Sequence, residues 1–318
     1  MKPYRAPAWL PGGHAQTIWP LLIKPQPLQL RRERWTTPDG DFIDVDHLDG
    51  PTNAPLLVLF HGLEGSAHSH YAISTAHACK KAGWRLALPH FRGCSGELNR
   101  RPRAYHSGDS EEIDWILRRL HAANGGRQLH AAGVSLGGNA LLKWAGERGP
   151  AAAELVTGVV AMCAPVDLAA CGHHLARGFN RVYTRHFLNT LKAISAARLR
   201  QFPGLFDATR MQQAINLYQF DDAVTAPVHG FAGADDYWQR ASAKPWLKSI
   251  AVPTLAVNPK NDPFLPAAYL PTMADVAPRV RLEQPAGGGH VGFVSGAFPG
   301  HLDWLPQRLL HFFLFETS

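Results

Sequence analysis

The sequence predicts an α/β protein in which a mostly parallel β-sheet is covered by helices on both faces. Continuous apolar runs such as "PLLVLFHG" at 55–62 are typical of parallel strands buried on both faces. Helical segments alternate with these runs, which indicates parallel strands joined by crossover helices. The alternation stops between about 166 and 250 and then resumes, so we expect one sheet domain that carries a helical insertion.

The expected elements follow one another in a regular order. The first 30 residues are rich in proline and lack periodicity, so we expect an irregular strap across the body of the protein. A hairpin is expected around the turn Pro38-Asp39-Gly40. The sheet domain then alternates between a strand at 55–62, a helix at 68–82, a strand at 84–93, a helix at 109–123, a strand into Ser135, a helix after it, strands at 155–165, 252–264 and 280–290, and a last helix near the C-terminus.

This order divides the chain into three parts. Residues 1–30 form the strap, 31–165 and 251–318 the α/β core, and 166–250 a helical cap insertion. A chain of 318 residues is long enough for one large domain with such an insertion. Apolar residues make up 46% and charged residues 18%, as in globular proteins with a sizeable core.

Charge and hydropathy exclude several classes of protein. The formal charge is +7 at pH 7, but Lys and Arg are scattered, so we expect no nucleic-acid partner. The four cysteines form no C-x-x-C pair and no disulfide framework. No apolar stretch reaches the ~18 residues of a membrane span, and the N-terminus lacks an uninterrupted signal-peptide core. We therefore expect a cytoplasmic protein without stable membrane insertion; the sequence leaves its oligomeric state open.

A serine among glycines is the strongest chemical signal. Residues 133–137 read G-V-S-L-G, between a strand and a helix. A nucleophile on a sharp strand-to-helix turn needs small neighbours, because strand and helix pass closely there. The amides that follow it stand at a helix N-terminus, where they can bind negative charge. Ser135 is therefore the candidate nucleophile.

A serine hydroxyl needs a base, and the order of the chain suggests which one. In folds with this turn, the acid and then the histidine follow the serine. Asp262 lies in the loop after the strand "VPTLAV", and His290 in the glycine-rich loop after the strand that begins at 280. We expect His290 to be the general base and Asp262 the carboxylate that orients it. Asp167 and Asp236 are weaker rivals, because neither leaves the later strand.

Acyl transfer also requires hydrogen-bond donors for the oxyanion. One donor is expected from the amide of Leu136, directly after the serine. The other is expected from the loop after the strand "LLVLF", which reads His61-Gly62-Leu63-Glu64-Gly65. Gly62 allows a close approach, so the Leu63 amide is the candidate.

Other motifs do not lead to a metal or a cofactor. The run 287–292 fits G-x-G-x-x-G, but no βαβ unit follows it, so dinucleotide binding is not expected. His68, His70, His77 and Cys79 lie on or beside one expected helix, and no second ligand pair exists elsewhere. We predict no metal site and no cofactor.

Motifs spread along nearly the whole chain carry a resemblance to a known family. They are "WLPGGHAQT", "FHGLEGS", "FRGCSGELNR", "YHSGDSEE", "GVSLGGN", "APVDL", "NPKNDPF" and "GGGHVGF". The chain resembles the YheT-like group of α/β-hydrolases, bacterial relatives of the animal ABHD-type lipases and esterases. The resemblance implies an α/β-hydrolase fold and a triad of Ser135, Asp262 and His290. It also implies a carboxylic-ester hydrolase, with short- to medium-chain acyl esters as small-molecule substrates.

Two other functions remain open from the sequence. The same triad serves amidases and peptidases, and the sequence does not discriminate between these and esterases. A ligand-binding protein that keeps the fold without catalysis is the other alternative, although such a protein would usually have lost the serine or the histidine. The physiological substrate and the leaving group are not specified by the sequence.

Overall fold

The structure, a computed structural model, describes residues 1–23 and 25–317. Its centre is an eight-stranded sheet with the order β1-β2-β4-β3-β5-β6-β7-β8. β1 pairs antiparallel with β2 and β2 with β4, and the remaining neighbours are parallel. The strands are β1 (Arg31–Thr36), β2 (Phe42–Leu48), β3 (Leu56–Phe60), β4 (Arg85–Pro89), β5 (Leu129–Val134), β6 (Val156–Met162), β7 (Thr254–Val257) and β8 (Val280–Glu283).

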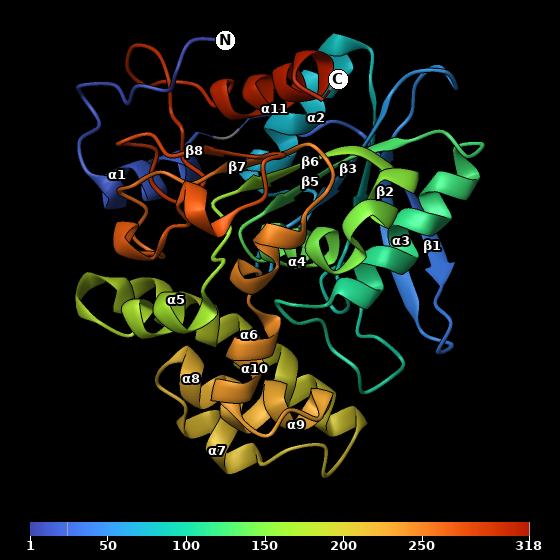
Figure 1. Ribbon diagram of the computed structural model, residues 1–318. Helices are drawn as coiled ribbons and strands as arrows, with labels where there is room; N and C mark the ends of the chain where they lie inside the picture. The colour runs from blue at the N-terminus through green and yellow to red at the C-terminus, as the bar shows by residue number, and fades with distance from the viewer. Residues whose placement is uncertain (24, 318) are drawn as a thin grey trace.

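Helices cover both faces of this sheet. On one face α2 (His70–Ala82) packs beside α11 (Trp304–Phe315), and on the other α3 (Ser110–Ala123) packs beside α4 (Leu136–Arg148) (Figure 1). This arrangement confirms the predicted fold class. The hairpin predicted around Pro38-Asp39-Gly40 is also confirmed, as the antiparallel pair β1 and β2.

The buried strand β3 shows why the sequence forms two cores. Side chains alternate between the faces of a strand, so a strand buried on both sides must be apolar at every position. Leu57 and Leu59 join the core under α2 and α11, whereas Val58 and Phe60 join the core under α3 and α4. The uninterrupted apolar run therefore supplies both layers.

The segment 166–250 is helical, and none of its residues belongs to a strand. The helices between 168 and 241 lie together below the sheet in Figure 1, whereas 244–249 packs against α4. An apolar cluster of their own includes Leu188, Met211 and Phe220. The elements of this segment are α5 (Leu168–Leu175), η3 (Gly178–Asn180), α6 (Arg181–Gln201), α7 (Ala208–Gln213), α8 (Leu217–Phe220), the π-helical turn η4 (Asp221–Thr225), α9 (Ala226–His229), α10 (Ala234–Ala241) and η5 (Lys244–Ser249).

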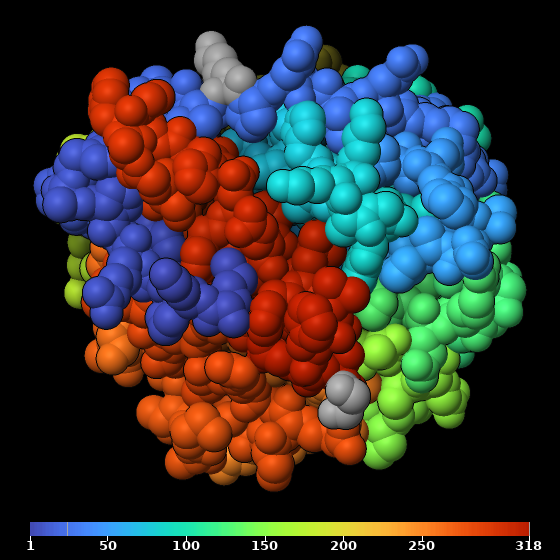
Figure 2. All heavy atoms as spheres, turned by 90° about the horizontal axis from the view of Figure 1, so that it is seen from above, coloured from blue at the N-terminus to red at the C-terminus, as the bar shows by residue number. Residues whose placement is uncertain are grey.

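The N-terminal segment is less irregular than the sequence predicts. It contains a short helix α1 (Gly13–Ile18) followed by η1 (Trp19–Leu21). Near the start of the chain, the Tyr4 ring packs edge-on against Phe293 and Trp304, with ring centroids 5.0 Å apart in each pair. Figure 2 shows the N-terminal residues in blue beside the C-terminal residues in red. The remaining short helices are η2 (Gly149–Glu154), η6 (Ala267–Tyr269) and η7 (Met273–Asp275).

Candidate active site

Ser135 stands on the turn between β5 and α4 with a strained backbone. Its φ is +51° and its ψ is −118°, a backbone conformation that residues other than glycine rarely adopt. The glycines around it are required by close contacts. A Cβ atom at Gly133 would lie 2.6 Å from the Gly137 carbonyl carbon, and one at Gly137 would lie 2.6 Å from the Phe60 carbonyl oxygen. The strand, the helix and β3 can approach this closely only without those side chains.

The loops after β7 and β8 bring an acid and a histidine to this serine. His290 Nε2 lies 3.0 Å from Ser135 Oγ, and His290 Nδ1 lies 2.9 Å from Asp262 Oδ2. The Asp262 side chain is only 2% exposed, and its other oxygen accepts a hydrogen bond of 2.8 Å from the Phe264 amide. The structure therefore brings together the three residues that the sequence singles out.

The rival acids lie elsewhere. Asp167 caps α5 by accepting a hydrogen bond of 3.0 Å from the Ala170 amide, and its other oxygen is 3.6 Å from Lys244 Nζ. Asp236 accepts from the Ala232 amide at 3.0 Å. Both carboxylates are used locally, as helix-end and loop contacts, and the structure records no contact of either with His290.

The N-terminal helix α1 holds the histidine loop in place. The Thr17 hydroxyl accepts a hydrogen bond of 2.8 Å from the His290 amide, and Gln16 Oε1 accepts one of 2.7 Å from the Gly288 amide. From the neighbouring loop, Asn261 Oδ1 accepts from the Gly289 amide at 3.0 Å. Sequence reasoning missed these supports. The only signal was the motif that ends in Gln16 and Thr17, which carried the family resemblance without a role.

The imidazole of His290 is also fixed by stacking. The Phe264 ring lies against it with centroids 3.8 Å apart and planes at 17°. Phe264 thus contacts the histidine by its ring and the aspartate by its amide. A ring held on one face and hydrogen-bonded at both nitrogens has little freedom to turn.

The two predicted oxyanion donors are on elements that meet at Ser135. Leu136 is the first residue of α4, and Leu63 lies in the loop after β3. Both side chains line the same cavity as Ser135. A Cβ atom at Gly62 would lie 3.3 Å from the Ser135 Cβ, so the loop passes close to the serine.

His61 supports the loop after β3 through hydrogen bonds of a neutral imidazole. It is fully buried, and burial lowers its pKa to about 3. Its Nδ1 lies 2.7 Å from the Gly62 carbonyl oxygen, and its Nε2 lies 3.0 Å from the Phe91 amide. These partners require the proton on Nδ1, which donates to Gly62, while Nε2 accepts from Phe91.

A buried thiol lies beside the acid and the histidine. The potential ligand atoms of Cys163, Asp262 and His290 lie within 4.8 Å of one another. Burial raises the pKa of Cys163 well above its ordinary value, so its sulfur stays a thiol at neutral pH, whereas metals bind the thiolate. The sulfur accepts a hydrogen bond of 3.2 Å from the Val291 amide. The donor set therefore fits hydrogen bonding better than metal ligation.

The histidines of α2 do not form a ligand set in the described residues. His70 Nε2 lies 3.2 Å from the Val291 carbonyl oxygen, and His77 Nε2 lies 2.7 Å from the Gln26 carbonyl oxygen. These contacts tie α2 to the histidine loop and to the N-terminal segment.

Ser135 lies between two hollows. The inner cavity, of about 140 Å³, extends under the helical segment and is lined largely by apolar side chains, among them Leu168, Leu175, Phe187, Leu191, Ile194 and Phe264. The outer groove, of about 650 Å³, runs along the N-terminal segment past Ile18, Leu21, Pro25 and His290. An ester carbonyl at Ser135 could direct one side of a substrate into each.

The ionisable side chains that line the inner cavity include those of Glu64, Arg92 and Arg198. Burial lowers the pKa of His106 and of His229 to about 3, so both rings are neutral. Burial raises the pKa of Asp221 to about 6, and its carboxylate accepts hydrogen bonds from Thr225 and Trp238. The cavity thus combines apolar walls with several polar and ionisable side chains.

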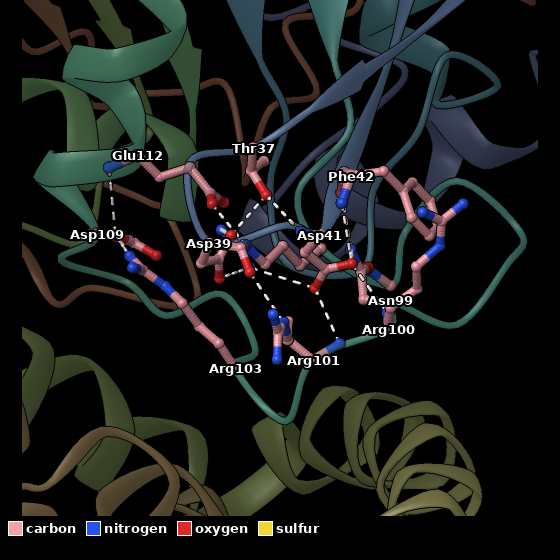
Figure 3. A network of polar contacts seen from close by, with 12 residues as sticks. Thr37, Asp39, Asp41, Phe42, Asn99, Arg100, Arg101, Arg103, Asp109 and Glu112 are labelled. Carbon is pink, nitrogen blue, oxygen red and sulfur yellow. Dashed lines mark hydrogen bonds and ion pairs between the residues drawn. The ribbon is translucent and has the colours of Figure 1, made fainter.

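A polar network fixes the loop between β4 and α3 (Figure 3). This loop forms one wall of the inner cavity. Arg92 Nε donates to Glu112 at 2.6 Å, and its Nη1 donates to Asp39 at 2.7 Å. The fully buried Asp41 accepts from the amides of Arg100 and Arg101, at 2.8 and 3.2 Å. The network joins the loop to the turn between β1 and β2.

Comparison with known proteins places the chain in a family. A family model described as the α/β-hydrolase fold matches residues 55–297. The chain is 41% identical to "Putative esterase YheT" of Escherichia coli over 93% of its own length and 88% of that protein. It belongs to the α/β-hydrolase family, in the YheT-like group. The resemblance predicted from the sequence motifs is thereby confirmed.

More distant α/β-hydrolases agree with this assignment. Mouse "Phospholipase ABHD3" is 28% identical over 97% of this chain and 77% of its own. The solved structure of an esterase from Exiguobacterium antarcticum superposes with a TM-score of 0.56 at 18% identity, covering 89% of this chain and all of that one. At this identity the superposition shows the shared fold.

Within the described residues, the structure has no helix with both the length and the apolar character needed to cross a membrane.

Proposed function

We propose that this hydrolase cleaves carboxylic esters, with Ser135 as nucleophile, His290 as general base and Asp262 as the orienting carboxylate. The observation that carries the proposal is the unbroken chain of contacts from Ser135 Oγ to His290 Nε2 at 3.0 Å and from His290 Nδ1 to Asp262 at 2.9 Å. A positioned base within hydrogen-bond reach is what makes a serine hydroxyl nucleophilic. The names of the bacterial and mouse relatives, a putative esterase and a phospholipase, support the same chemistry.

The reaction would proceed through an acyl-enzyme. Ser135 Oγ attacks the ester carbonyl carbon while His290 Nε2 takes the hydroxyl proton. The amides of Leu63 and Leu136 donate to the oxyanion of the tetrahedral intermediate. The bond to the alcohol then breaks, and His290 returns the proton to the leaving oxygen. A water molecule, deprotonated by His290, releases the acid by the same steps in reverse.

We assign the helical segment 166–250 the role of a cap that selects the acyl part of the substrate. The inner cavity lies under this segment, and its apolar lining suits a short- to medium-chain acyl group. The outer groove is open and borders His290, so it suits the departing alcohol. Residues 1–30 would then act as a strap that forms one wall of the groove.

A substrate panel tests this proposal. Wild type and Ser135→Ala are compared on p-nitrophenyl esters from acetate to decanoate and on the matching p-nitroanilides. We expect ester turnover that exceeds amide turnover, falls at the longest chains, and is lost in a folded Ser135→Ala variant. Faster cleavage of amides would favour the amidase alternative. Turnover unchanged by Ser135→Ala would remove the serine from the mechanism, and no turnover of any substrate would favour a non-catalytic binding protein.

A further inference from the structure

Two tyrosine hydroxyls hold the loop that carries the Leu63 amide. The Gly62 amide donates a hydrogen bond of 2.9 Å to the Tyr71 hydroxyl, and the Glu64 amide donates one of 3.0 Å to the Tyr105 hydroxyl. Leu63 lies between these two amides. In the described part of the chain, no acceptor is hydrogen-bonded to the Leu63 amide. The loop is thus fixed on both sides of the one amide that stays available.

Glu64 needs this support because its backbone is strained. Its φ is +53°, in the left-handed region that favours glycine. The Tyr105 hydroxyl binds the same residue twice, since it also donates to the Glu64 carboxylate at 2.5 Å. One hydroxyl therefore holds both the amide and the side chain of the strained residue, which fixes the peptide that follows Leu63.

The sequence of the loop leaves room for the other tyrosine. A Cβ atom at Gly65 would lie 2.5 Å from the Tyr71 hydroxyl oxygen and 3.0 Å from the Gly62 carbonyl oxygen. The Gly65 amide itself donates to that carbonyl at 2.9 Å. A side chain at position 65 would therefore push the tyrosine away from Gly62. The second glycine of "HGLEG" is explained by this contact.

Tyr105 is itself held firmly. It lies on the loop between β4 and α3, which the network of Figure 3 joins to the turn between β1 and β2. Its ring stacks on Phe91, with centroids 5.4 Å apart and planes at 10°. Burial raises the pKa of both tyrosine hydroxyls, so they remain protonated at neutral pH.

We propose that Tyr71 and Tyr105 are positioning residues for the reaction, which hold Gly62–Glu64 so that the Leu63 amide faces the developing oxyanion. This inference rests on the proposed ester hydrolysis at Ser135. Neither hydroxyl exchanges a proton with the substrate. Each acts through the orientation of the Leu63 amide.

The proposal has a distinct kinetic signature. A donor to the oxyanion acts in the transition state, so misplacing it lowers kcat and leaves KM nearly unchanged. Removing an oxyanion donor costs about 10²–10³ in kcat, and a misaligned donor is expected to cost less, on the order of 10–100-fold. A merely structural tyrosine would lower thermal stability without this change in kcat.

The test uses Tyr71→Phe and Tyr105→Phe, with Tyr4→Phe as the matched control. Tyr4 is a buried tyrosine whose hydroxyl donates one hydrogen bond of 2.8 Å to the Val294 carbonyl. Each variant is measured for kcat and KM on p-nitrophenyl butyrate, for inhibition by butylboronic acid, which forms a tetrahedral serine adduct, and for thermal unfolding. We expect both loop variants to lose about 10–100-fold in kcat and a similar factor in boronate affinity. Tyr4→Phe should lose only thermal stability.

Wild-type kcat and boronate affinity in both loop variants would overturn the proposal, as would an effect on KM alone. If Tyr105→Phe does not fold, Tyr71→Phe carries the test, because its hydroxyl holds the opposite side of the loop. Failure of the proposed function would look different, since wild type itself would then neither hydrolyse the ester nor bind the boronate.

Discussion

Replacing Asp262 by asparagine tests the orienting carboxylate with little change in shape. The two carboxylate oxygens have different partners, the Phe264 amide at 2.8 Å and His290 Nδ1 at 2.9 Å. An amide group keeps only one of these acceptors. If its NH₂ faced Phe264, two donors would meet at a side chain that is 2% exposed, which costs about 1–3 kcal/mol. We therefore expect the NH₂ to face His290.

That orientation places the imidazole proton on the wrong nitrogen. The NH₂ donates to Nδ1, so the remaining imidazole proton sits on Nε2 and points at Ser135. A protonated Nε2 cannot accept the proton of the serine hydroxyl. Loss of the correct tautomer and of the charge that stabilises imidazolium lowers kcat by about 10⁴, or about 5.4 kcal/mol. The measurement is kcat on a p-nitrophenyl ester, with thermal unfolding to establish that the variant folds.

Asp167→Asn is the matched control, since this carboxylate only caps α5 and lies near Lys244. We expect it to keep nearly the wild-type kcat. A folded Asp262→Asn variant with a kcat within tenfold of wild type would show that His290 works without this carboxylate. An equal loss in Asp167→Asn would move the orienting role to that residue.

Three further substitutions test the serine turn, the support of the histidine loop and a buried carboxylate. In Gly137→Ala the new methyl group would collide with the His61 carbonyl oxygen. We therefore expect the free energy of unfolding to fall by more than about 3 kcal/mol and turnover to be lost. A melting temperature equal to that of wild type would show that the turn has room for the methyl group. Thr17→Val leaves the His290 amide without its hydrogen-bond acceptor. We expect kcat to fall several-fold and the free energy of unfolding, measured by chemical denaturation, to fall by about 1–2 kcal/mol. An unchanged kcat would show that Thr17 does not support the histidine loop. Burial raises the pKa of the Asp221 carboxyl group from 3.8 to about 6. The contribution of this group to the free energy of unfolding therefore declines as pH rises from 3.8 to 6 and is constant above that range. Asp221→Asn should remove up to about 1–3 kcal/mol of that decline, and parallel curves of melting temperature against pH for both proteins would contradict this.

The sheet and the serine turn could be predicted because their signals are local. The apolar run of β3 and the glycines at 133 and 137 can each be recognised from a few neighbouring residues, although Gly137 makes its close contact with Phe60 on β3. Asp262 and His290 could be chosen from seventeen histidines and many acids because chain order restricts which loops reach the serine.

The supports of the site could not be predicted in the same way. Gln16 is hydrogen-bonded to Gly288, which lies 272 positions away in the sequence. The six residues of α1 are too few to form a periodic pattern that would predict this contact. Tyr105 reaches Glu64 across 41 positions from a loop without regular structure. Such contacts depend on how the finished sheet brings loops together, which residue types and spacing do not specify.

Whether Ser135 is an activated nucleophile can be measured by labelling the protein with a fluorophosphonate probe. Wild type and Ser135→Ala are treated side by side, after thermal unfolding has shown that both are folded. We expect wild type to be labelled at Ser135 and the variant to remain unlabelled. A folded wild type that resists the probe, or a variant labelled as strongly as wild type, would contradict it.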